Sequence, residues 1–199
     1  MKPYNIVLAG VGGQGVITVG KILVEASLRE GKNAVMSEVH GMAQRGGNVI
    51  SEVRIGDVLG PIIPPGEADL VLGFELIEPL RYPEKFGKDT VLIVNNDRIM
   101  SLTVLLGEEK YPETESVIEE LKKLAKRLYI INATKLAQEE AGSALATNMV
   151  MLGAALAVGV PLRKETIESV LEDIFKGKVL EINKKALELG YKAIKETEK

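Results

Sequence analysis

The chain contains no cysteine and no tryptophan, and it has a single histidine, His40, among 199 residues. Without thiols it cannot form disulfides, bind an iron–sulfur cluster, hold zinc through cysteine or use a cysteine nucleophile. One imidazole also excludes a multi-histidine metal centre, and no tight acidic cluster stands out to replace it. We therefore expect any electron transfer connected with this protein to occur on another molecule.

The chain also lacks a basic excess, an aromatic-rich surface and a long apolar run. Its net charge of −3 argues against a broad nucleic-acid surface, and an aromatic content of 4% argues against stacking platforms for bases. The longest apolar run, Met149 to Leu162, is shorter than the ~20 residues of a membrane span. The apolar run near the first residue is too short for a signal peptide. We expect a cytoplasmic protein with no nucleic-acid and no membrane partner.

What is present is the pattern of an α/β protein. Continuous apolar runs predict buried strands at residues 4–10, 33–39, 69–74, 90–96 and 129–133, whereas residues 48–56 alternate, which is typical of a half-exposed, antiparallel strand. Helical periodicity predicts helices at 14–31, 115–128, 133–141, 144–159, 163–177 and 179–196. Three prolines and two glycines predict a loop at 57–68. We expect one Rossmann-like domain over residues 1–199, with a mostly parallel sheet that has an antiparallel or mixed portion, and a helical C-terminal part.

A glycine-rich turn joins the first expected strand to the first expected helix. Gly10, Gly12 and Gly15 have the G-x-G-x-x-G spacing of dinucleotide-binding turns, in which main-chain N–H groups at the helix start can hold an anion. The same glycines can serve only to make a tight connection. Glu38, 23 residues after Gly15, is a candidate for the ribose position of an NAD site. An independent NAD-binding dehydrogenase domain is therefore one alternative.

A second block, S-E-V-H-G-M-A-Q-R-G-G from Ser37 to Gly47, accompanies the first, G-V-G-G-Q-G from Gly10 to Gly15. Together they resemble the gamma-type module of the 2-oxoacid:ferredoxin oxidoreductases, and in particular the small, beta subunit of the indolepyruvate enzymes. The resemblance extends over most of the chain. In relatives the module is a gamma subunit, or a fused domain, of pyruvate and ketoisovalerate oxidoreductases, which is the second alternative.

The resemblance implies an oxidoreductase subunit that is inactive alone. In such enzymes a large alpha subunit carries thiamine diphosphate, magnesium and 4Fe-4S clusters. It decarboxylates a 2-oxoacid, here an aryl pyruvate such as indolepyruvate, and passes electrons to ferredoxin, while coenzyme A takes the acyl group. Substrate choice lies mostly in that subunit. This chain is expected to bind no cofactor tightly and no metal, in agreement with its lack of cysteine.

Candidate site residues lie in the two blocks, although none is assigned a catalytic role outright. His40 can exchange protons near neutral pH, and Arg45 can clamp a carboxylate or phosphate, so both are possible contributors at the subunit interface. Alternatively His40 fixes its loop and Arg45 pairs with Glu38 or Glu52. Possible contacts for a phosphate or for coenzyme A are Gly10, Gly12, Gly13, Gln14 and Gly15.

The expected helix at 144–159 is apolar nearly all round, which predicts burial in the domain or in an interface. Asn148 is the polar exception near its start. Because a buried amide needs hydrogen-bond partners, we expect Asn148 to satisfy a loop carbonyl or an interface group.

Overall fold

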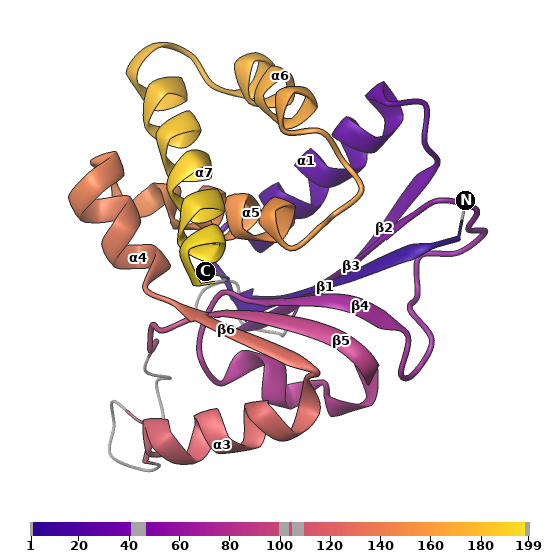
Figure 1. Cartoon of the computed structure of the whole chain (residues 1–199), viewed down its shortest axis with the longest axis vertical. Helices are drawn as coiled ribbons and strands as arrows, with labels where there is room; N and C mark the ends of the chain where they lie inside the picture. Colours follow the sequence, from indigo (N-terminus) through magenta and orange to yellow (C-terminus); the bar gives the residue numbers. More distant parts are fainter. Residues whose placement is uncertain (1, 41–46, 100–103, 105–109, 198–199) are drawn as a thin grey trace.

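The computed structural model of this chain describes residues 2–40, 47–99, 104 and 110–197. These residues form a six-stranded sheet in the order β2-β3-β1-β4-β5-β6 (Figure 1). The strands β1, β4, β5 and β6 are parallel, whereas β3 is antiparallel to both of its neighbours, β1 and β2. The expected α/β fold, with a mostly parallel sheet and an antiparallel portion, is confirmed. The strand bounds are β1 (Tyr4–Val11), β2 (Ala34–His40), β3 (Asn48–Ile55), β4 (Ala68–Gly73), β5 (Phe86–Asn95) and β6 (Arg127–Ile131).

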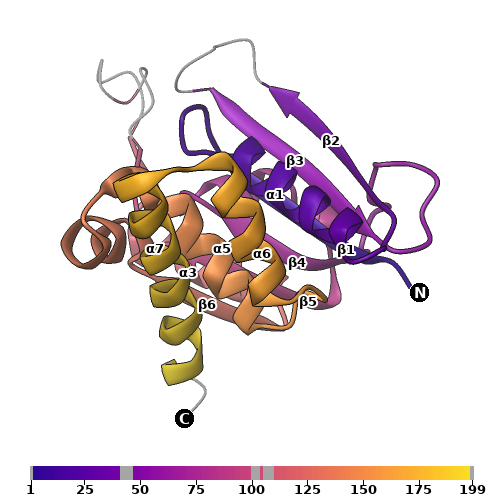
Figure 2. The same cartoon turned by 90° about the horizontal axis from the view of Figure 1, so that it is seen from above.

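Helices cover both faces of the sheet, as Figures 1 and 2 show. One face carries α1 (Val16–Arg29), α5 (Thr147–Ala157), α6 (Lys164–Ile174) and α7 (Gly177–Thr197). The other carries α3 (Thr114–Leu124) and the 3₁₀ turns η1 (Glu78–Arg81) and η2 (Pro83–Lys85). Between β6 and α5 lie α4 (Ala133–Lys135), the π-helical segment η3 (Leu136–Ala141) and the 3₁₀ turn η4 (Ala144–Ala146). Because β1, β4 and β5 are buried between two apolar layers, their sequences are continuous apolar runs.

Two expected helices end differently from the sequence prediction. The helix predicted over 115–128 stops at Leu124, because Arg127 and Leu128 already pair with Val91 and Leu92 of β5 as the start of β6. Sheet pairing therefore overrides the helical periodicity of this segment. The helix predicted over 144–159 is a 3₁₀ turn, η4, followed by α5, which ends at Ala157.

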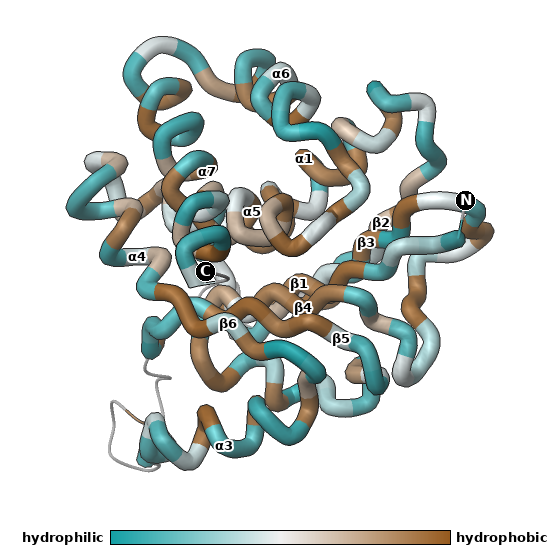
Figure 3. The backbone as a smooth tube through the Cα atoms, in the orientation of Figure 1, coloured by the Kyte–Doolittle hydropathy of each residue, from teal (hydrophilic) through white to brown (hydrophobic). Residues whose placement is uncertain are grey.

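The helices α5 and α7 cross in backbone contact. A Cβ atom added to Gly153 would lie 1.9 Å from the carbonyl oxygen of Leu187, and one added to Gly190 would lie 1.8 Å from that of Val150. The two glycines therefore permit a crossing that any other residue would prevent. Figure 3 shows α5 as a hydrophobic segment between the sheet and the outer helices. Its burial within the molecule agrees with the expectation from its composition.

A buried ion pair holds the proline-rich loop against the sheet. Lys85 Nζ lies 2.9 Å from Glu52 Oε1, and both side chains are nearly inaccessible to solvent. Lys85 Nζ also donates to the carbonyl oxygen of Ile63 at 2.9 Å, and the main-chain N–H of Ile63 donates to the Glu52 carboxylate. The segment at 57–67 contains no helix or strand, as expected from its prolines.

Candidate functional site

The glycine turn lies at the carboxyl edge of the parallel strands, directly between β1 and α1. Gly13 and Gly15 have φ values of 101° and 76°, which side-chain-bearing residues rarely adopt. The main-chain N–H of Gln14 donates to the carbonyl oxygen of Val11 at 3.1 Å, and that of Val19 donates to Gly15 at 3.1 Å. The turn thus delivers the chain from the strand into the first turn of α1, with the helix start facing the edge of the sheet.

The side chain of Gln14 fills the space above this turn. Its Oε1 accepts the main-chain N–H of Val11 at 2.7 Å, and its Nε2 donates to the carbonyl oxygen of Phe74 at 2.9 Å. A Cβ atom at Gly10 would lie 2.8 Å from Gln14 Oε1, so glycine at this position leaves room for the amide. Both polar groups of Gln14 therefore take part in internal bonds that connect β1 with the end of β4.

The two sequence blocks meet at this edge. The main-chain N–H of Gly12 donates to the carbonyl oxygen of Gly47 at 2.9 Å, and Val11 pairs with Asn48 at the start of β3. His40 ends β2 and pairs with Val49. Arg45 lies outside the described residues, as does the side chain of His40. What the structure establishes is that the strands bearing the second block converge on the glycine turn.

Glu38 does not come to the position that a dinucleotide site requires. In a Rossmann unit the acidic residue ends the strand next to β1. Here β3 occupies that place, and Glu38 pairs with Ser51 on the far side of β3. The hairpin formed by β2 and β3 replaces the parallel strand, and this topology weighs against the NAD-binding alternative.

A hollow of about 210 Å³ opens beside the turn. Its walls include Gly13 to Gly15, the segment at 144–148, and polar residues that follow the strands β5 and β6. Thr134 Oγ1 donates to Asp97 Oδ2 at 2.8 Å. Buried Asn95 accepts the N–H of Ala133 at 2.9 Å and donates to Thr134 Oγ1 at 2.9 Å, which fixes the two strand ends together. Sequence reasoning missed these residues, although polar side chains directly after buried strands were a usable signal.

Asn148, near the start of α5, is buried and lines this hollow. A Cβ atom at Gly15 would lie 2.3 Å from Asn148 Nδ2, so the amide packs directly on the glycine turn. Asn148 is 8% exposed, and its Oδ1 is buried without a hydrogen-bond partner within the described part of the chain. The expected burial of Asn148 near the start of this helix is confirmed. That its amide satisfies a loop carbonyl or an interface group stays a prediction.

A larger cavity, of about 580 Å³, lies beyond the turn on the side of α3. Glu78, Arg81 and Lys110 line it together with apolar residues. Arg81 Nε donates to Glu78 Oε1 at 2.9 Å, while the buried Oε2 has no partner among the described residues. Burial raises the pKa of the Glu78 carboxyl, and the Arg81 guanidinium offsets part of this effect. The cavity therefore combines positive side chains with a desolvated acid.

A buried glutamate supports the wall of this cavity. Glu75 is 1% exposed and accepts the main-chain N–H of Ile77 at 2.7 Å, that of Ile99 at 3.2 Å and the phenol of Tyr111. Burial, followed by the bond to the Glu75 carboxylate, raises the pKa of the Tyr111 phenol. The guanidinium of Arg98 lies 5.6 Å from the centre of the Tyr111 ring. These contacts fix the position of Tyr111 at the cavity.

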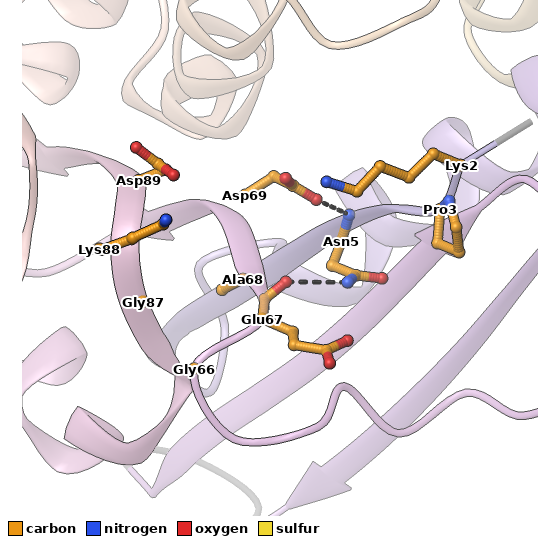
Figure 4. Close-up of a pocket in the computed structure, with 10 residues that line it drawn as sticks. All are labelled: Lys2, Pro3, Asn5, Gly66, Glu67, Ala68, Asp69, Gly87, Lys88 and Asp89. Carbon is orange, nitrogen blue, oxygen red and sulfur yellow. Dashed lines mark hydrogen bonds between the residues drawn. The ribbon is translucent and has the colours of Figure 1, made fainter.

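A third hollow, of about 330 Å³, lies at the opposite, amino edge of the strands (Figure 4). The main-chain N–H of Asn5 donates to Asp69 Oδ2 at 2.8 Å, and the Asn5 amide donates to the carbonyl oxygen of Glu67 at 2.8 Å. Arg54 Nε donates to Asn5 Oδ1 at 3.0 Å. These bonds tie the starts of β1 and β4 together, so we interpret the hollow as a structural junction. It is remote from both sequence blocks.

Within residues 2–40, 47–99, 104 and 110–197, no group of three or more histidine, aspartate or glutamate side chains is arranged to hold a metal ion. In the same part of the chain, no helix combines the length and apolar character needed to cross a bilayer.

Comparison with known proteins gives a consistent result. A model of the family described as pyruvate ferredoxin/flavodoxin oxidoreductase matches residues 5–193. The chain is 44% identical to indolepyruvate oxidoreductase subunit IorB of Archaeoglobus fulgidus, over 94% of this chain and 93% of that protein. It is 30% identical to the common gamma subunit of the pyruvate/ketoisovalerate oxidoreductases of Pyrococcus abyssi, over 89% of each chain.

A solved structure agrees with the sequence comparison. The gamma subunit of a keto/oxoacid ferredoxin oxidoreductase from Geobacter sulfurreducens superposes with a TM-score of 0.71 at 27% identity, over 97% of this chain and 99% of that one. The resemblance drawn from the two glycine-containing blocks is therefore confirmed over nearly the whole length. This chain belongs to the pyruvate ferredoxin/flavodoxin oxidoreductase family.

Proposed function

We propose that this chain is the small subunit of an indolepyruvate:ferredoxin oxidoreductase. Family membership and near-full-length similarity already make it a small subunit of a 2-oxoacid:ferredoxin oxidoreductase. The choice of an aryl pyruvate is supported by 44% identity to an indolepyruvate subunit, against 30% to a pyruvate/ketoisovalerate subunit. The proposal depends on the sequence comparison. Because the two blocks meet at the carboxyl edge of the sheet, we place the functional site of this chain there.

The larger subunit is proposed to hold thiamine diphosphate, magnesium and the iron–sulfur clusters, and to pass electrons to ferredoxin. The residues of this chain do not fit an iron–sulfur cluster, because it has no cysteine with which to ligate one. This chain is proposed to contribute binding and positioning at the carboxyl edge of its sheet. His40 and Arg45, which belong to the block that reaches the glycine turn through Gly47, remain candidate contributors at the subunit interface.

Coenzyme A is proposed to contact the carboxyl edge. Asp97 is the charged side chain among the described lining residues of the 210 Å³ hollow, so this hollow suits hydroxyl or amine donors better than phosphate. Phosphates are better matched by the neighbouring 580 Å³ cavity, to which Arg81 and Lys110 bring positive charge. Ile99 lines both hollows, so the two are neighbours, and we propose that they receive different parts of one ligand.

Reconstitution tests the proposed function. The chain is purified alone and with its larger subunit, and reduction of ferredoxin is measured with indolepyruvate, phenylpyruvate and pyruvate in the presence of coenzyme A. We expect no turnover by this chain alone, and turnover by the complex with the aryl substrates preferred. Full activity of the larger subunit without this chain, or a preference for pyruvate, would contradict the proposal.

Substitution at the hollow tests the coenzyme A contact. In the reconstituted complex we expect Asp97→Asn to raise KM for coenzyme A about 10-fold, because one charge-assisted hydrogen bond is weakened. KM for the 2-oxoacid should not change. Lys88→Gln, at the opposite edge of the sheet, is the matched surface control. A parallel rise in both KM values would show that Asp97 acts on the fold rather than on coenzyme A.

A further inference from the structure

An apolar hollow of about 310 Å³ lies on the helical side of the glycine turn. Part of its apolar wall comes from η4, through Leu145 and Ala146. The rest comes from Phe175, just before α7, and from Val179 and Ile182 in the first turns of α7. Leu145 is 91% exposed and Val179 is 52% exposed. Two large apolar side chains therefore stand in water around one concave site, instead of being scattered singly over the surface.

Leu145 is held outward by local hydrogen bonds. The hydroxyl of Ser143 accepts the main-chain N–H of Leu145 at 3.3 Å, and the hydroxyl of Thr147 donates to the carbonyl oxygen of Ala144 at 2.6 Å. The 3₁₀ turn η4 thus has a defined backbone on both sides of Leu145. An apolar side chain presented on a fixed turn loses little conformational entropy when it is covered, which favours binding.

The same hollow contains an unmet hydrogen-bonding group. Asn148 lines it, and the buried Oδ1 of this residue has no partner among the described residues. The other amide at this site, Asn183, donates to the carbonyl oxygen of Val179 at 2.8 Å and so is already engaged. An unpaired buried acceptor is costly, and because this oxygen is not accessible from the hollow, a donor there removes the cost only if the Asn148 side chain turns toward it.

The hollow is adjacent to the candidate site. Leu145 and Asn148 line both it and the hollow beside Gly13 to Gly15. A protein seated on Leu145 would therefore border the edge at which the two sequence blocks meet. Because the relatives of this chain are subunits of oxidoreductases, we expect a protein neighbour of this kind for this chain.

We propose that this hollow is a docking site for the larger subunit of the same enzyme. That subunit covers Leu145 and Val179 with apolar side chains, and it anchors the contact with an aromatic residue, a tyrosine or tryptophan. Aromatic residues of this kind are the usual anchors of protein interfaces. The inference rests on the proposed function insofar as the larger subunit is the partner.

The experiment measures assembly and turnover separately. The chain and its Leu145→Asp variant are titrated with the larger subunit, and the Kd is determined by sedimentation or surface capture. We expect Leu145→Asp to raise the Kd at least 30-fold, since it removes an anchor and places a charge in an apolar contact. Val179→Asp is expected to act in the same direction.

Leu59→Asp is the matched control. Leu59 is fully exposed on the proline-rich loop, which precedes β4 and so lies at the opposite edge of the sheet. Its substitution should leave the Kd within about 3-fold of the original value. Thermal unfolding of the free variants checks the fold, and because Leu145 is exposed we expect no loss of stability.

Three results would overturn the docking site. One is assembly of Leu145→Asp with unchanged affinity. Another is a rise in Kd for Leu59→Asp as large as that for Leu145→Asp. The third is a homodimer of the chain alone that Leu145→Asp converts to a monomer, because the surface would then join two copies. Failure of the proposed function is distinguishable, since it appears as a tight complex that does not turn over aryl pyruvates.

Discussion

At the scale of single residues, the glycine turn owes its shape to one amide as much as to its glycines. Gln14 bonds to Val11 and to Phe74, so it closes the turn onto the end of the neighbouring strand β4. An N–H at the end of β1 would otherwise lack a partner in a region of low solvent access. Gln14 is thus part of the frame of the site, and its contact with a phosphate or with coenzyme A stays a prediction.

Gln14→Leu tests this role. The change keeps a similar volume but leaves the Val11 N–H and the Phe74 carbonyl without this partner. We expect a loss of about 1–3 kcal/mol in the free energy of unfolding, measured by urea denaturation. Gln14→Glu retains the acceptor for Val11 but loses the donor to Phe74. Its free energy of unfolding should lie between those of Gln14→Leu and the original chain. Equal stability of all three would contradict the assignment.

Glu30 connects the end of α1 with the start of α6. Its Oε1 accepts the main-chain N–H of Arg163 at 2.8 Å, and its Oε2 lies 2.7 Å from Lys32 Nζ. Burial alone would raise the pKa of this carboxyl, but the bonds from Lys32, Arg163 and Thr166 prevail and lower it to about 2. The carboxylate therefore acts like the N3 glutamate of a capping box, accepting the main-chain N–H of the N-cap residue Arg163, but it is supplied from elsewhere in the chain.

This pKa predicts a defined loss of stability in acid. The stabilisation from Glu30 is complete above its unfolded-state pKa of about 4.5 and is lost as the pH falls toward the folded-state pKa of about 2. We expect Glu30→Gln to lower the free energy of unfolding at pH 7. The variant should also lose less stability than the original chain as the pH falls from about 4.5 to about 2. Urea midpoints measured across this range check it, with Glu25→Gln on the exposed side of α1 as the control. An unchanged acid slope in Glu30→Gln would refute the prediction.

At the scale of elements, the contact between α5 and α7 depends on two glycines that face each other across the crossing. Gly153 and Gly190 each allow the carbonyl of the other helix into the space of a Cβ atom. The helical periodicity of either segment does not reveal this, because close approach is a property of the pair. The sequence identified the apolar helix but not the surface on which it packs.

Gly153→Ala and Gly190→Ala are therefore expected to be destabilising, although alanine is the better helix former. Each added methyl would overlap a backbone carbonyl, and separating the helices should cost about 3 kcal/mol or more, at the upper end of overpacking effects. Gly60→Ala, where a Cβ meets nothing within 4 Å, is the control and should change stability by less than about 0.5 kcal/mol. Thermal or urea unfolding distinguishes these outcomes.

At the scale of the whole molecule, one apolar cluster joins the sheet to the C-terminal helices. It includes Leu8 of β1, Ile93 of β5, Met151 of α5 and Leu187 of α7. The expectation of a single domain over residues 1–199 stays a prediction. We expect far-UV circular dichroism and tyrosine fluorescence to report coincident, two-state urea transitions, because the same core serves both parts. An early transition confined to the helices would indicate two folding units.

The sequence by itself determined the succession of strands and helices, the loop predicted at 57–68 and the family. Each of these depends on local signals: apolar runs, periodicity, prolines, and the blocks at Gly10–Gly15 and Ser37–Gly47. The absence of cysteine likewise excluded iron–sulfur chemistry within this chain. Such inferences need no knowledge of which residues meet in space.

Tertiary structure alone decided what those elements place together. The insertion of β3 between β1 and β2 moved Glu38 away from the glycine turn, and residues that follow two different strands formed the network of Asn95, Asp97 and Thr134 at the carboxyl edge. The helix boundary at Leu124 and the crossing at Gly153 were also fixed by partners distant in the sequence. Pairing and packing energies depend on both members of a contact, and one segment read alone contains only half of that information.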